Sequence, residues 1–156
     1  MWETDTIKGK QILIVDDEVK NTKLLRGMLF SENYDSYENH SGEQALDTVR
    51  AIKPDLILLD VMMPGIDGYE VCRRLKADQR TRHIPVIFLS ALDKESDELQ
   101  GLDSGAVDFI TKPFEHEVLI VRLEKALERS ALIQENSRLQ QVCGSEAIFE
   151  DLVGKS

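Results

Sequence analysis

Five short apolar runs alternate with longer segments of helical periodicity along this chain. In the helical segments, apolar residues recur three and four positions apart, which is the spacing of one helix face. The alternation predicts parallel β/α units with right-handed crossovers, stacked as one sheet between two layers of helices. The second run is polar for a strand, so it is expected at an edge of the sheet. The runs lie at about residues 11–15, 34–38, 55–59, 85–89 and 107–111.

The helical segments place their apolar residues in stripes that are suited to covering the sheet. The stripes of the first four helices consist of Leu24, Leu25, Met28 and Leu29, then Ala45, Leu46, Val49 and Ile52, then Tyr69, Val71, Cys72 and Leu75, and finally Leu99 with Leu102. A chain of 156 residues with a hydrophobic fraction of 42% can bury a sizeable core beneath these stripes.

The last helical segment is much longer than a helix that only covers a sheet. From about Glu115 the chain contains neither Gly nor Pro until Gly144. Beyond Arg129 the helix is expected to leave the domain by about 20 Å, at about 1.5 Å per residue. Its first half can pack on the sheet through Leu119, Leu123, Ala126 and Leu127.

The second half of this helix carries a short heptad pattern. Leu132 and Leu139 fit d positions, with Asn136 at the a position between them and Cys143 at the next a position. A single Asn at an a position fixes the register of parallel dimers. The pattern therefore indicates a dimeric coiled coil, and a solvated single helix supported by flanking structure is the alternative.

Charge and cysteine content narrow the classes of function. The net charge of -10 argues against nucleic-acid binding by this stretch, because phosphate contacts need basic patches. No apolar run approaches the roughly 20 residues of a membrane span, and the polar, acidic N-terminus is not expected to act as a signal peptide. Cys72 and Cys143 lack the spacing of a metal site and are expected to be reduced thiols in a cytoplasmic protein.

Four of the predicted strands end in polar side chains. Asp16 and Asp17 follow the first strand, Asp60 the third, Ser90 the fourth and Lys112 the fifth. Parallel strands place their carboxyl ends at one edge of a sheet, so these groups converge on one crevice. Carboxylates this close repel one another unless a cation lies among them. The pattern therefore predicts a divalent metal site with a lysine beside it.

Four motifs surround these polar residues in a fixed order. They are Val15-Asp16-Asp17-Glu18, Asp60-Val61-Met62-Met63-Pro64-Gly65-Ile66-Asp67-Gly68, Leu89-Ser90-Ala91, and Gly105-Ala106-Val107-Asp108-Phe109-Ile110-Thr111-Lys112-Pro113-Phe114. Together they resemble the receiver domain of two-component response regulators. The resemblance implies a flavodoxin-like (βα)5 fold, a doubly wound parallel sheet with strand order 2-1-3-4-5, here extended by a long C-terminal helix. The expected organisation is an N-terminal tail over 1–9, a receiver domain over 10–128, a helical linker over 129–143 and the start of a truncated effector domain over 144–156.

The resemblance also implies a role for each residue at the predicted metal site. Asp60 would accept a phosphoryl group as an acyl phosphate. Asp17 would bind Mg²⁺ directly and Asp16 mainly through water, while the Met62 backbone carbonyl would supply another oxygen. Lys112 would pair with the phosphoryl group, and a plain surface lysine is the alternative for this residue. The peptide bond between Lys112 and Pro113 is expected to be cis.

Two further residues match the switch positions of receiver domains. Ser90 would donate a hydrogen bond to the phosphoryl group and move inward on phosphorylation, although a helix N-cap is the alternative for this side chain. Phe109 would turn inward as Ser90 moves, altering the face formed by the fourth helix, fifth strand and fifth helix. A plain core phenylalanine is the alternative for Phe109. In receiver domains, two positions control the lifetime of the phosphoryl group. They correspond here to Met62, two residues after Asp60, and Leu92, two residues after Ser90. Neither side chain can orient an attacking water, so we expect a long-lived acyl phosphate.

The expected partners follow from the same resemblance. A sensor histidine kinase would supply the phosphoryl group, and a homodimer would form through the C-terminal helix, through the switch face, or through both. The segment after the helix resembles the entry to the AAA+ ATPase domain of σ54-dependent, nitrogen-regulator-type transcriptional activators, with DNA binding left to a missing C-terminal domain. No membrane partner is expected.

Other functions remain as alternatives. The receiver could control a diguanylate cyclase or another output domain. A metal-dependent phosphatase that works through a phospho-aspartate would need an acidic residue two positions after the aspartate, where this chain has Met62. A nucleotide-binding α/β domain would need a glycine-rich loop after Val15, where Asp16, Asp17 and Glu18 would repel a phosphate. We therefore expect a regulatory phosphoacceptor domain and not an enzyme.

Overall fold

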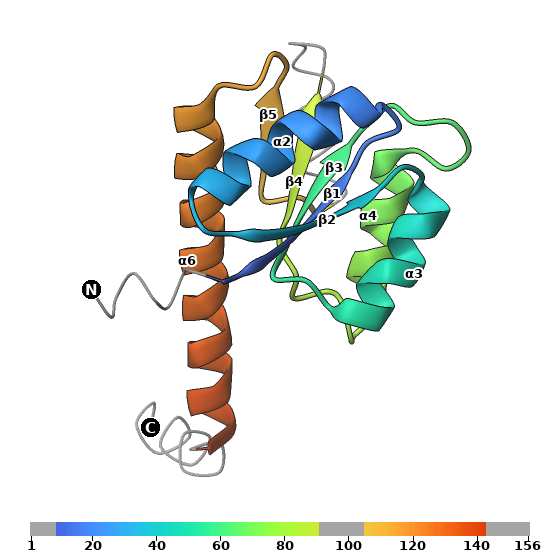
Figure 1. Ribbon diagram of the computed structural model, residues 1–156. Coiled ribbons are helices and arrows are strands. Elements are labelled where there is room, and N and C mark those ends of the chain that lie inside the picture. The colour runs from blue at the N-terminus through green and yellow to red at the C-terminus, as the bar shows by residue number, and fades with distance from the viewer. Residues whose placement is uncertain (1–8, 91–104, 143–156) are drawn as a thin grey trace.

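The computed structural model describes residues 9–90 and 105–142 of the chain, with only the backbone described over 133–142. The elements are β1 (Gln11–Val15), α2 (Val19–Ser31), β2 (Asp35–Asn39), α3 (Gly42–Ile52), β3 (Leu56–Asp60), α4 (Gly68–Ala77), β4 (Val86–Ser90), β5 (Asp108–Thr111) and α6 (His116–Val142). The sheet forms the central layer, with α2 and α6 on one face and α3 and α4 on the other (Figure 1).

The sheet has the predicted topology. All neighbouring strands pair in parallel in the order β2-β1-β3-β4-β5, which is the flavodoxin-like order, and the polar strand β2 lies at an edge as expected. β1 spans the predicted residues, but the other four strands begin one residue later than predicted. β3 and β4 also end one residue later than predicted, because pairing continues into polar residues: Asp60 is in register with Leu89, and Ser90 with Thr111.

Two apolar layers hold the helices to the sheet, because successive side chains of a strand point to opposite faces. Leu13 and Phe88 belong to the layer under α3 and α4, where the Phe88 ring meets Tyr69 edge-on with ring centres 5.2 Å apart. Ile14 and Ile87 belong to the layer under α2 and α6. The described side chains of β1, β3 and β4 are almost completely enclosed between these layers, which fixes the positions of the strand ends.

Leu24, a member of the predicted apolar stripes, does not join the core. Leu24 in α2 is 48% exposed, whereas Leu25 and Leu29 are fully buried and Met28 is partly buried against the same layer. Leu24 and Leu25 are adjacent, about 100° apart around a helix of 3.6 residues per turn, and only one of them can face the sheet here. The predicted helix around Leu99 and Leu102 lies outside the described residues.

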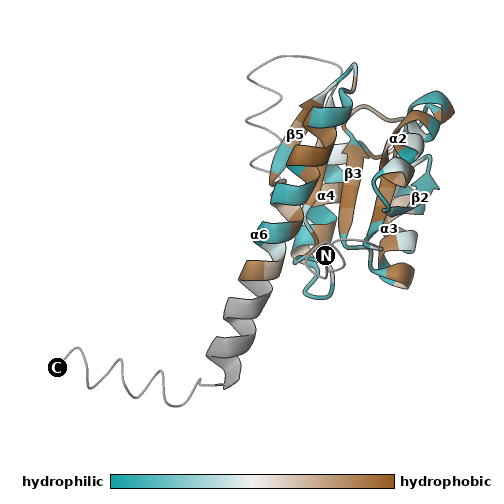
Figure 2. Ribbon diagram, turned by 60° about the vertical axis from the view of Figure 1, so that its left-hand side comes forward, coloured by the Kyte–Doolittle hydropathy of each residue, from teal (hydrophilic) through white to brown (hydrophobic). Residues whose placement is uncertain are grey.

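The long C-terminal helix is present as predicted. α6 is a single helix from His116 to Val142, and its second half projects past the end of the sheet (Figures 1 and 2). The predicted packing residues of its first half, Leu119, Leu123, Ala126 and Leu127, are all buried. Leu132, the first residue of the predicted heptad pattern, is 65% exposed. The side chains of Asn136 and Leu139, and all of Cys143, lie outside the described residues.

The described part of the chain contains no helix with both the length and the apolar character needed to cross a membrane. Cys72 lies in the core as a reduced thiol, and burial raises its pKa to about 11, so its reactive thiolate is scarce at neutral pH.

Candidate functional site

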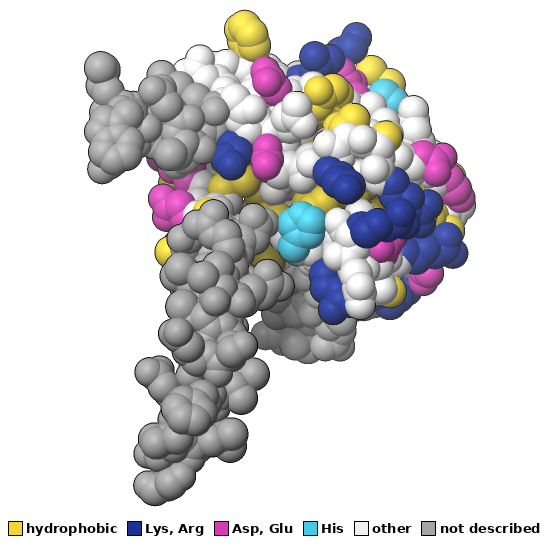
Figure 3. Space-filling view, turned by 90° about the horizontal axis from the view of Figure 1, so that it is seen from below, with side chains coloured by type: hydrophobic (Ala, Val, Ile, Leu, Met, Phe, Trp, Pro, Cys, Tyr) yellow, Lys and Arg dark blue, Asp and Glu magenta, His cyan; other side chains and the backbone are white. Residues whose placement is uncertain are grey.

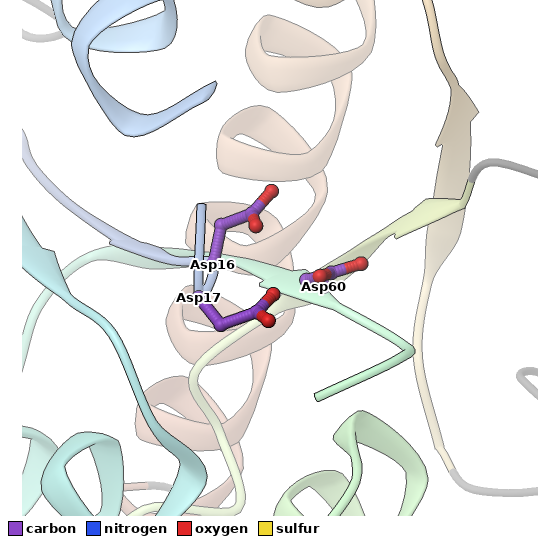
Figure 4. A group of neighbouring side chains, drawn as sticks. All are labelled: Asp16, Asp17 and Asp60. Atoms are coloured by element: carbon purple, nitrogen blue, oxygen red, sulfur yellow. The ribbon is translucent and has the colours of Figure 1, made fainter. Parts of the chain in front are cut away.

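The C-terminal edge of the sheet gathers the polar residues that the sequence places at strand ends. Asp60 is the last residue of β3, and Asp16 and Asp17 directly follow β1 (Figure 4). Ser90 is the last residue of β4, and Lys112 directly follows β5. Because β3 lies between β1 and β4, the Asp60 side chain is at the centre of this rim.

Three carboxylates come together at this rim. Each of Asp16, Asp17 and Asp60 offers one oxygen such that the three oxygens lie within 4.8 Å of one another. Asp16 is fully buried, Asp60 is 4% exposed, and Asp17 is exposed to solvent. One side of the cluster is therefore closed by protein, while the side at Asp17 is open to an approaching ion or phosphoryl donor.

Asp16 is held in place by donors from the beginning of α2 and by Lys112. Its Oδ1 accepts a hydrogen bond from the Glu18 backbone N–H at 2.9 Å, and its Oδ2 accepts one from the Asn21 amide at 3.0 Å. The Lys112 Nζ lies 3.4 Å from Oδ2. These contacts fix the buried carboxylate rigidly beside Asp60. Asn21 was not predicted from the sequence, although its position in the first turn of α2, close after the aspartates, is a signal that indicates a partner for them.

The environment of Asp60 opposes its ionisation. Burial of the carboxyl group, followed by the nearby negative charge of Asp16, raises the pKa of Asp60 from 3.8 to about 7. The positive charge of Lys112, whose Nζ lies 3.6 Å from Oδ1, and a hydrogen bond from the Met62 backbone N–H act in the opposite direction without cancelling the effect. The cluster therefore lacks sufficient positive charge, which a bound cation would supply.

A tight loop after β3 brings the start of α4 against Asp60. The Gly68 N–H donates a hydrogen bond to the Val61 carbonyl at 2.9 Å, and a Cβ on Gly68 would lie 2.3 Å from the Asp60 carbonyl oxygen. Asp67 caps α4 by accepting a hydrogen bond from the Glu70 N–H at 2.9 Å. Only glycine fits position 68, and this requirement was not recognised from the sequence.

Met62 presents its backbone to the site and its side chain to solvent. Its N–H bonds the Asp60 carboxylate, while the side chain is 69% exposed. The residue therefore contributes no acid or amide beside Asp60. Leu92, the other residue expected to control phosphoryl lifetime, lies outside the described residues.

Ser90 and Lys112 are tied to each other through the backbone. Ser90 is 7% exposed at the end of β4, and its carbonyl accepts a hydrogen bond from the Lys112 N–H at 2.8 Å. The peptide bond from Lys112 to Pro113 is cis, as expected. Ser90 is part of a strand, and the helix that it would cap under the alternative interpretation lies outside the described residues.

Phe109 is neither fully buried nor fully exposed. Its ring packs against the edge of the apolar layer under α3 and α4. The Arg122 guanidinium carbon lies 6.0 Å from the ring centre, and Arg122 Nη1 donates to the Phe109 carbonyl at 3.1 Å and to Asp108 Oδ1 at 2.6 Å. This Asp108–Arg122 pair spans β5 and α6, and no pattern in the sequence predicts it.

The donor set at the rim fits Mg²⁺. This ion prefers an octahedral shell of oxygen atoms and takes only one or two of them from carboxylates, with waters and phosphate oxygens in the remaining positions. Asp16, Asp17 and Asp60 provide carboxylate oxygens on a face that is partly open to solvent, with no sulfur or imidazole among the three residues.

Comparison with known proteins shows which proteins this chain resembles. The family described as the response regulator receiver domain matches residues 12–124. The response regulator PleD of Caulobacter vibrioides is 46% identical over 134 residues, which cover 86% of this chain and 29% of PleD. The phosphate regulon transcriptional regulatory protein PhoB of Pseudomonas aeruginosa is 45% identical over 122 residues, which cover 78% of this chain and 53% of PhoB. The chain thus spans between about a quarter and about a half of these relatives' length.

Solved structures show the same architecture. NtrX from Brucella abortus superposes with a TM-score of 0.78 at 32% identity, covering 84% of this chain and 29% of that chain. The receiver domain of the sensor histidine kinase PA1611 from Pseudomonas aeruginosa superposes with a TM-score of 0.72 at 31% identity, covering 77% of this chain and 98% of that domain. In that structure a magnesium ion is coordinated in the active site cleft.

Proposed function

Because this chain belongs to the response regulator receiver domain family, we propose that Asp60 accepts a phosphoryl group from the phosphohistidine of a sensor kinase. The observation that carries the proposal is the placement of Asp60 beside the buried Asp16, with the Lys112 ammonium in contact with both carboxyl groups. A carboxylate oxygen of Asp60 attacks phosphorus, the bond from phosphorus to the histidine nitrogen breaks, and an acyl phosphate forms. The histidine leaves as a neutral imidazole once it takes up a proton.

The other rim residues have separate roles in this reaction. Asp17, Asp60 and the Met62 carbonyl would hold Mg²⁺ directly, and Asp16 mainly through water. When bound, the ion would supply positive charge for the phosphoryl oxygens. Lys112 pairs with a phosphoryl oxygen after transfer, since its ammonium already lies within 3.6 Å of the acceptor. The buried Asp16 keeps Lys112 close to Asp60 before the phosphoryl group arrives.

The switch involves Ser90 and Phe109. The Ser90 hydroxyl moves toward the phosphoryl group and donates a hydrogen bond to it, and Phe109 turns inward behind it. Phe109 is partly buried and lies under the Arg122 guanidinium, so its movement would disturb the Asp108–Arg122 contact between β5 and α6. Phosphorylation thereby biases two arrangements of the surface around α6.

The output is a C-terminal effector whose activity depends on the dimer state. The projecting helix α6, with Leu132 exposed, supports a dimer through this helix. A σ54-activating AAA+ ATPase is the effector that we favour. A structure of NtrX in complex with ATP matches 84% of this chain, and the match covers only 30% of the NtrX chain, which therefore extends well beyond it. A diguanylate cyclase or another output domain is the alternative.

Incubation with a small phosphoryl donor, acetyl phosphate, tests the proposal directly. With Mg²⁺, intact-protein mass spectrometry should show the addition of one phosphoryl group to the wild-type chain. Asp60→Asn should abolish the addition, whereas Asp47→Asn, a change at an exposed acid on α3, should retain it. Undiminished labelling of the Asp60→Asn variant would refute the assignment of the acceptor.

A further inference from the structure

The end of the sheet opposite the acidic rim is basic. Lys10 precedes β1, Lys53 precedes β3, and Arg82 precedes β4, so all three lie at the N-terminal edge of the parallel sheet. Figure 3 looks onto this end of the molecule and shows dark blue Lys and Arg side chains gathered over it. A concentration of cations is notable on a chain whose net charge is -10, because it creates a strong local field of the opposite sign.

Two adjoining hollows lie at this basic end, beside α6. They have volumes of about 160 Å³ and 210 Å³ and share His83, Pro85 and Ser130 as a common wall. The cationic side chains around them are Lys10, Lys53, Lys76, Arg82 and Arg129. Among the described residues, the only acid lining either hollow is Asp55, which is paired with Lys10 at 4.0 Å. We call the two hollows together the basic groove.

Three of these cations have no acidic partner within the described part of the chain. Lys53, Arg82 and Arg129 are exposed and form no ion pair with any described residue. By contrast, Arg26, Arg73, Arg74, Arg80 and Arg122 each pair with a carboxylate. The basic groove therefore holds charge that the described part of the fold leaves unneutralised.

The groove is rigid and has an apolar floor. Lys76 Nζ donates to the carbonyls of Arg82 at 3.0 Å and Ile84 at 2.7 Å, which fixes the loop before β4. Pro85, Val107 and Ala126 line the floor next to that loop. A ligand that combines carboxylates with apolar side chains would match both features, whereas a simple inorganic anion would use only the charged rim.

The chain contains a segment of this composition directly after α6. Residues 148–152 read Ile-Phe-Glu-Asp-Leu, with two adjacent acids flanked by large apolar side chains. From Ser130 in the groove wall to Val142, α6 rises by about 18 Å. If the chain turns at Gly144, five or six extended residues cover about 18 Å in return. Glu150 and Asp151 then come level with the groove.

We propose that the segment Ile148–Leu152, which lies outside the described residues, binds back into the basic groove of the same chain. Glu150 and Asp151 pair with Arg82 and Arg129, and Phe149 and Leu152 cover the floor at Pro85 and Val107. The contact would couple the beginning of whatever follows α6 to the receiver domain at the pole opposite Asp60. It requires no phosphoryl group and does not rest on the function proposed for the acidic rim.

Paramagnetic relaxation in the full chain tests this contact. A spin label on Val153→Cys, in a Cys143→Ser background, should broaden the amide signals of residues 82–85 and 129–131 in NMR spectra. The buried thiol of Cys72 will not take the label. Reversing the groove charges with Arg82→Glu and Arg129→Glu should reduce the broadening at least about fivefold, since two ion pairs become repulsive.

A charge exchange makes the test specific. Glu150→Lys with Asp151→Lys should also abolish the broadening, and combining all four reversals should restore it. Lys20→Glu with Lys23→Glu, which changes exposed cations on α2 outside the groove, should leave it unchanged. The proposal is wrong if the label broadens no groove signals or if the broadening is insensitive to Arg82 and Arg129. Spin-labelled copies can also be mixed with isotope-labelled copies that lack the spin label. Broadening of the groove signals in the latter would overturn the proposal, since the contact would then be between chains.

Discussion

Lys112 Nζ lies 3.6 Å from Asp60 Oδ1, yet this contact does not hold the Asp60 carboxyl in its charged form. The same ammonium lies 3.4 Å from Asp16, so one positive charge is shared by two buried carboxyl groups. Burial and the Asp16 charge therefore prevail, and the pKa of Asp60 rises to about 7. The metal-free site is a local source of instability, and its stability should respond to pH and to Mg²⁺.

Asp60→Asn should stabilise the metal-free protein at pH 8. The folded-state pKa of Asp60, about 7, is above the ordinary value of 3.8, so the folded protein retains a proton between these values that the unfolded chain has released. The free energy of unfolding therefore decreases as pH rises from about 4 to about 7, and the full loss is reached above pH 7. Replacing the ionisable carboxyl with the neutral amide of Asn should add on the order of 1–3 kcal/mol to the free energy of unfolding at pH 8.

Urea unfolding in EDTA at pH 8 and pH 5 measures this effect. The advantage of Asp60→Asn over the wild type should shrink at pH 5, where Asp60 is largely protonated. Adding Mg²⁺ at pH 8 should stabilise the wild type and leave the variant nearly unchanged. An advantage of Asp60→Asn that is equal at both pH values would contradict the electrostatic origin of the effect.

The acyl phosphate on Asp60 should persist for hours in Mg²⁺ buffer. Met62 is 69% exposed beside the acceptor and carries no group that can orient an attacking water. Met62→Asn places an amide there and should accelerate hydrolysis roughly tenfold or more. Phosphoprotein decay, followed by intact-protein mass spectrometry, gives the rate, with Met62→Leu as the control that should match the wild type. Decay of the wild-type phosphoprotein within minutes would show that another residue positions the water.

The sequence was sufficient to predict the arrangement of strands and the convergence of the rim residues. Apolar runs mark the buried strands, and the parallel order then places Asp16, Asp60 and Lys112 on one edge without any knowledge of side-chain packing. The ends of β3 and β4 were missed by one residue because Asp60 and Ser90 pair as strand residues despite their polarity.

Individual side-chain contacts between elements were not predictable in this way. Asp108 and Arg122 are fourteen residues apart, on a strand and a helix, and meet only after α6 docks on the sheet. Asn21 reaches Asp16 because the loop after β1 turns directly into α2. Neither pair follows a periodic pattern, so hydrophobic periodicity carries no information about them.

Dimerisation through α6 should depend on its exposed apolar residues. Leu132 is 65% exposed, and Leu139 follows it by one heptad on the same helix. Leu132→Asp combined with Leu139→Asp should shift the chain toward the monomer in sedimentation velocity, because charges in a coiled-coil seam are poorly solvated. Ala131→Asp, an exposed change next to the seam, should leave the dimer intact. An unchanged mass for the double variant would place the dimer contacts elsewhere.

Gly68 should be the most sensitive of the glycines near Asp60. A Cβ at Gly68 would lie 2.3 Å from the Asp60 carbonyl oxygen and 2.9 Å from the Val61 Cα, both of which are backbone atoms that cannot rotate away. Gly68→Ala must therefore displace the loop after β3, and we expect a loss of about 1–3 kcal/mol in the free energy of unfolding. The same displacement should slow phosphorylation of Asp60, because Met62 would move with the loop.

Gly27→Ala is the matched control for this substitution. Gly27 lies within α2, and a Cβ added there would meet no described atom within 4 Å, so alanine should stabilise the helix by about 0.5–1 kcal/mol. Urea unfolding of both variants, together with labelling by acetyl phosphate, separates a steric effect at the site from a general effect of replacing glycine. If Gly68→Ala were as stable and as readily phosphorylated as Gly27→Ala, the close approach of α4 to Asp60 would have no functional importance.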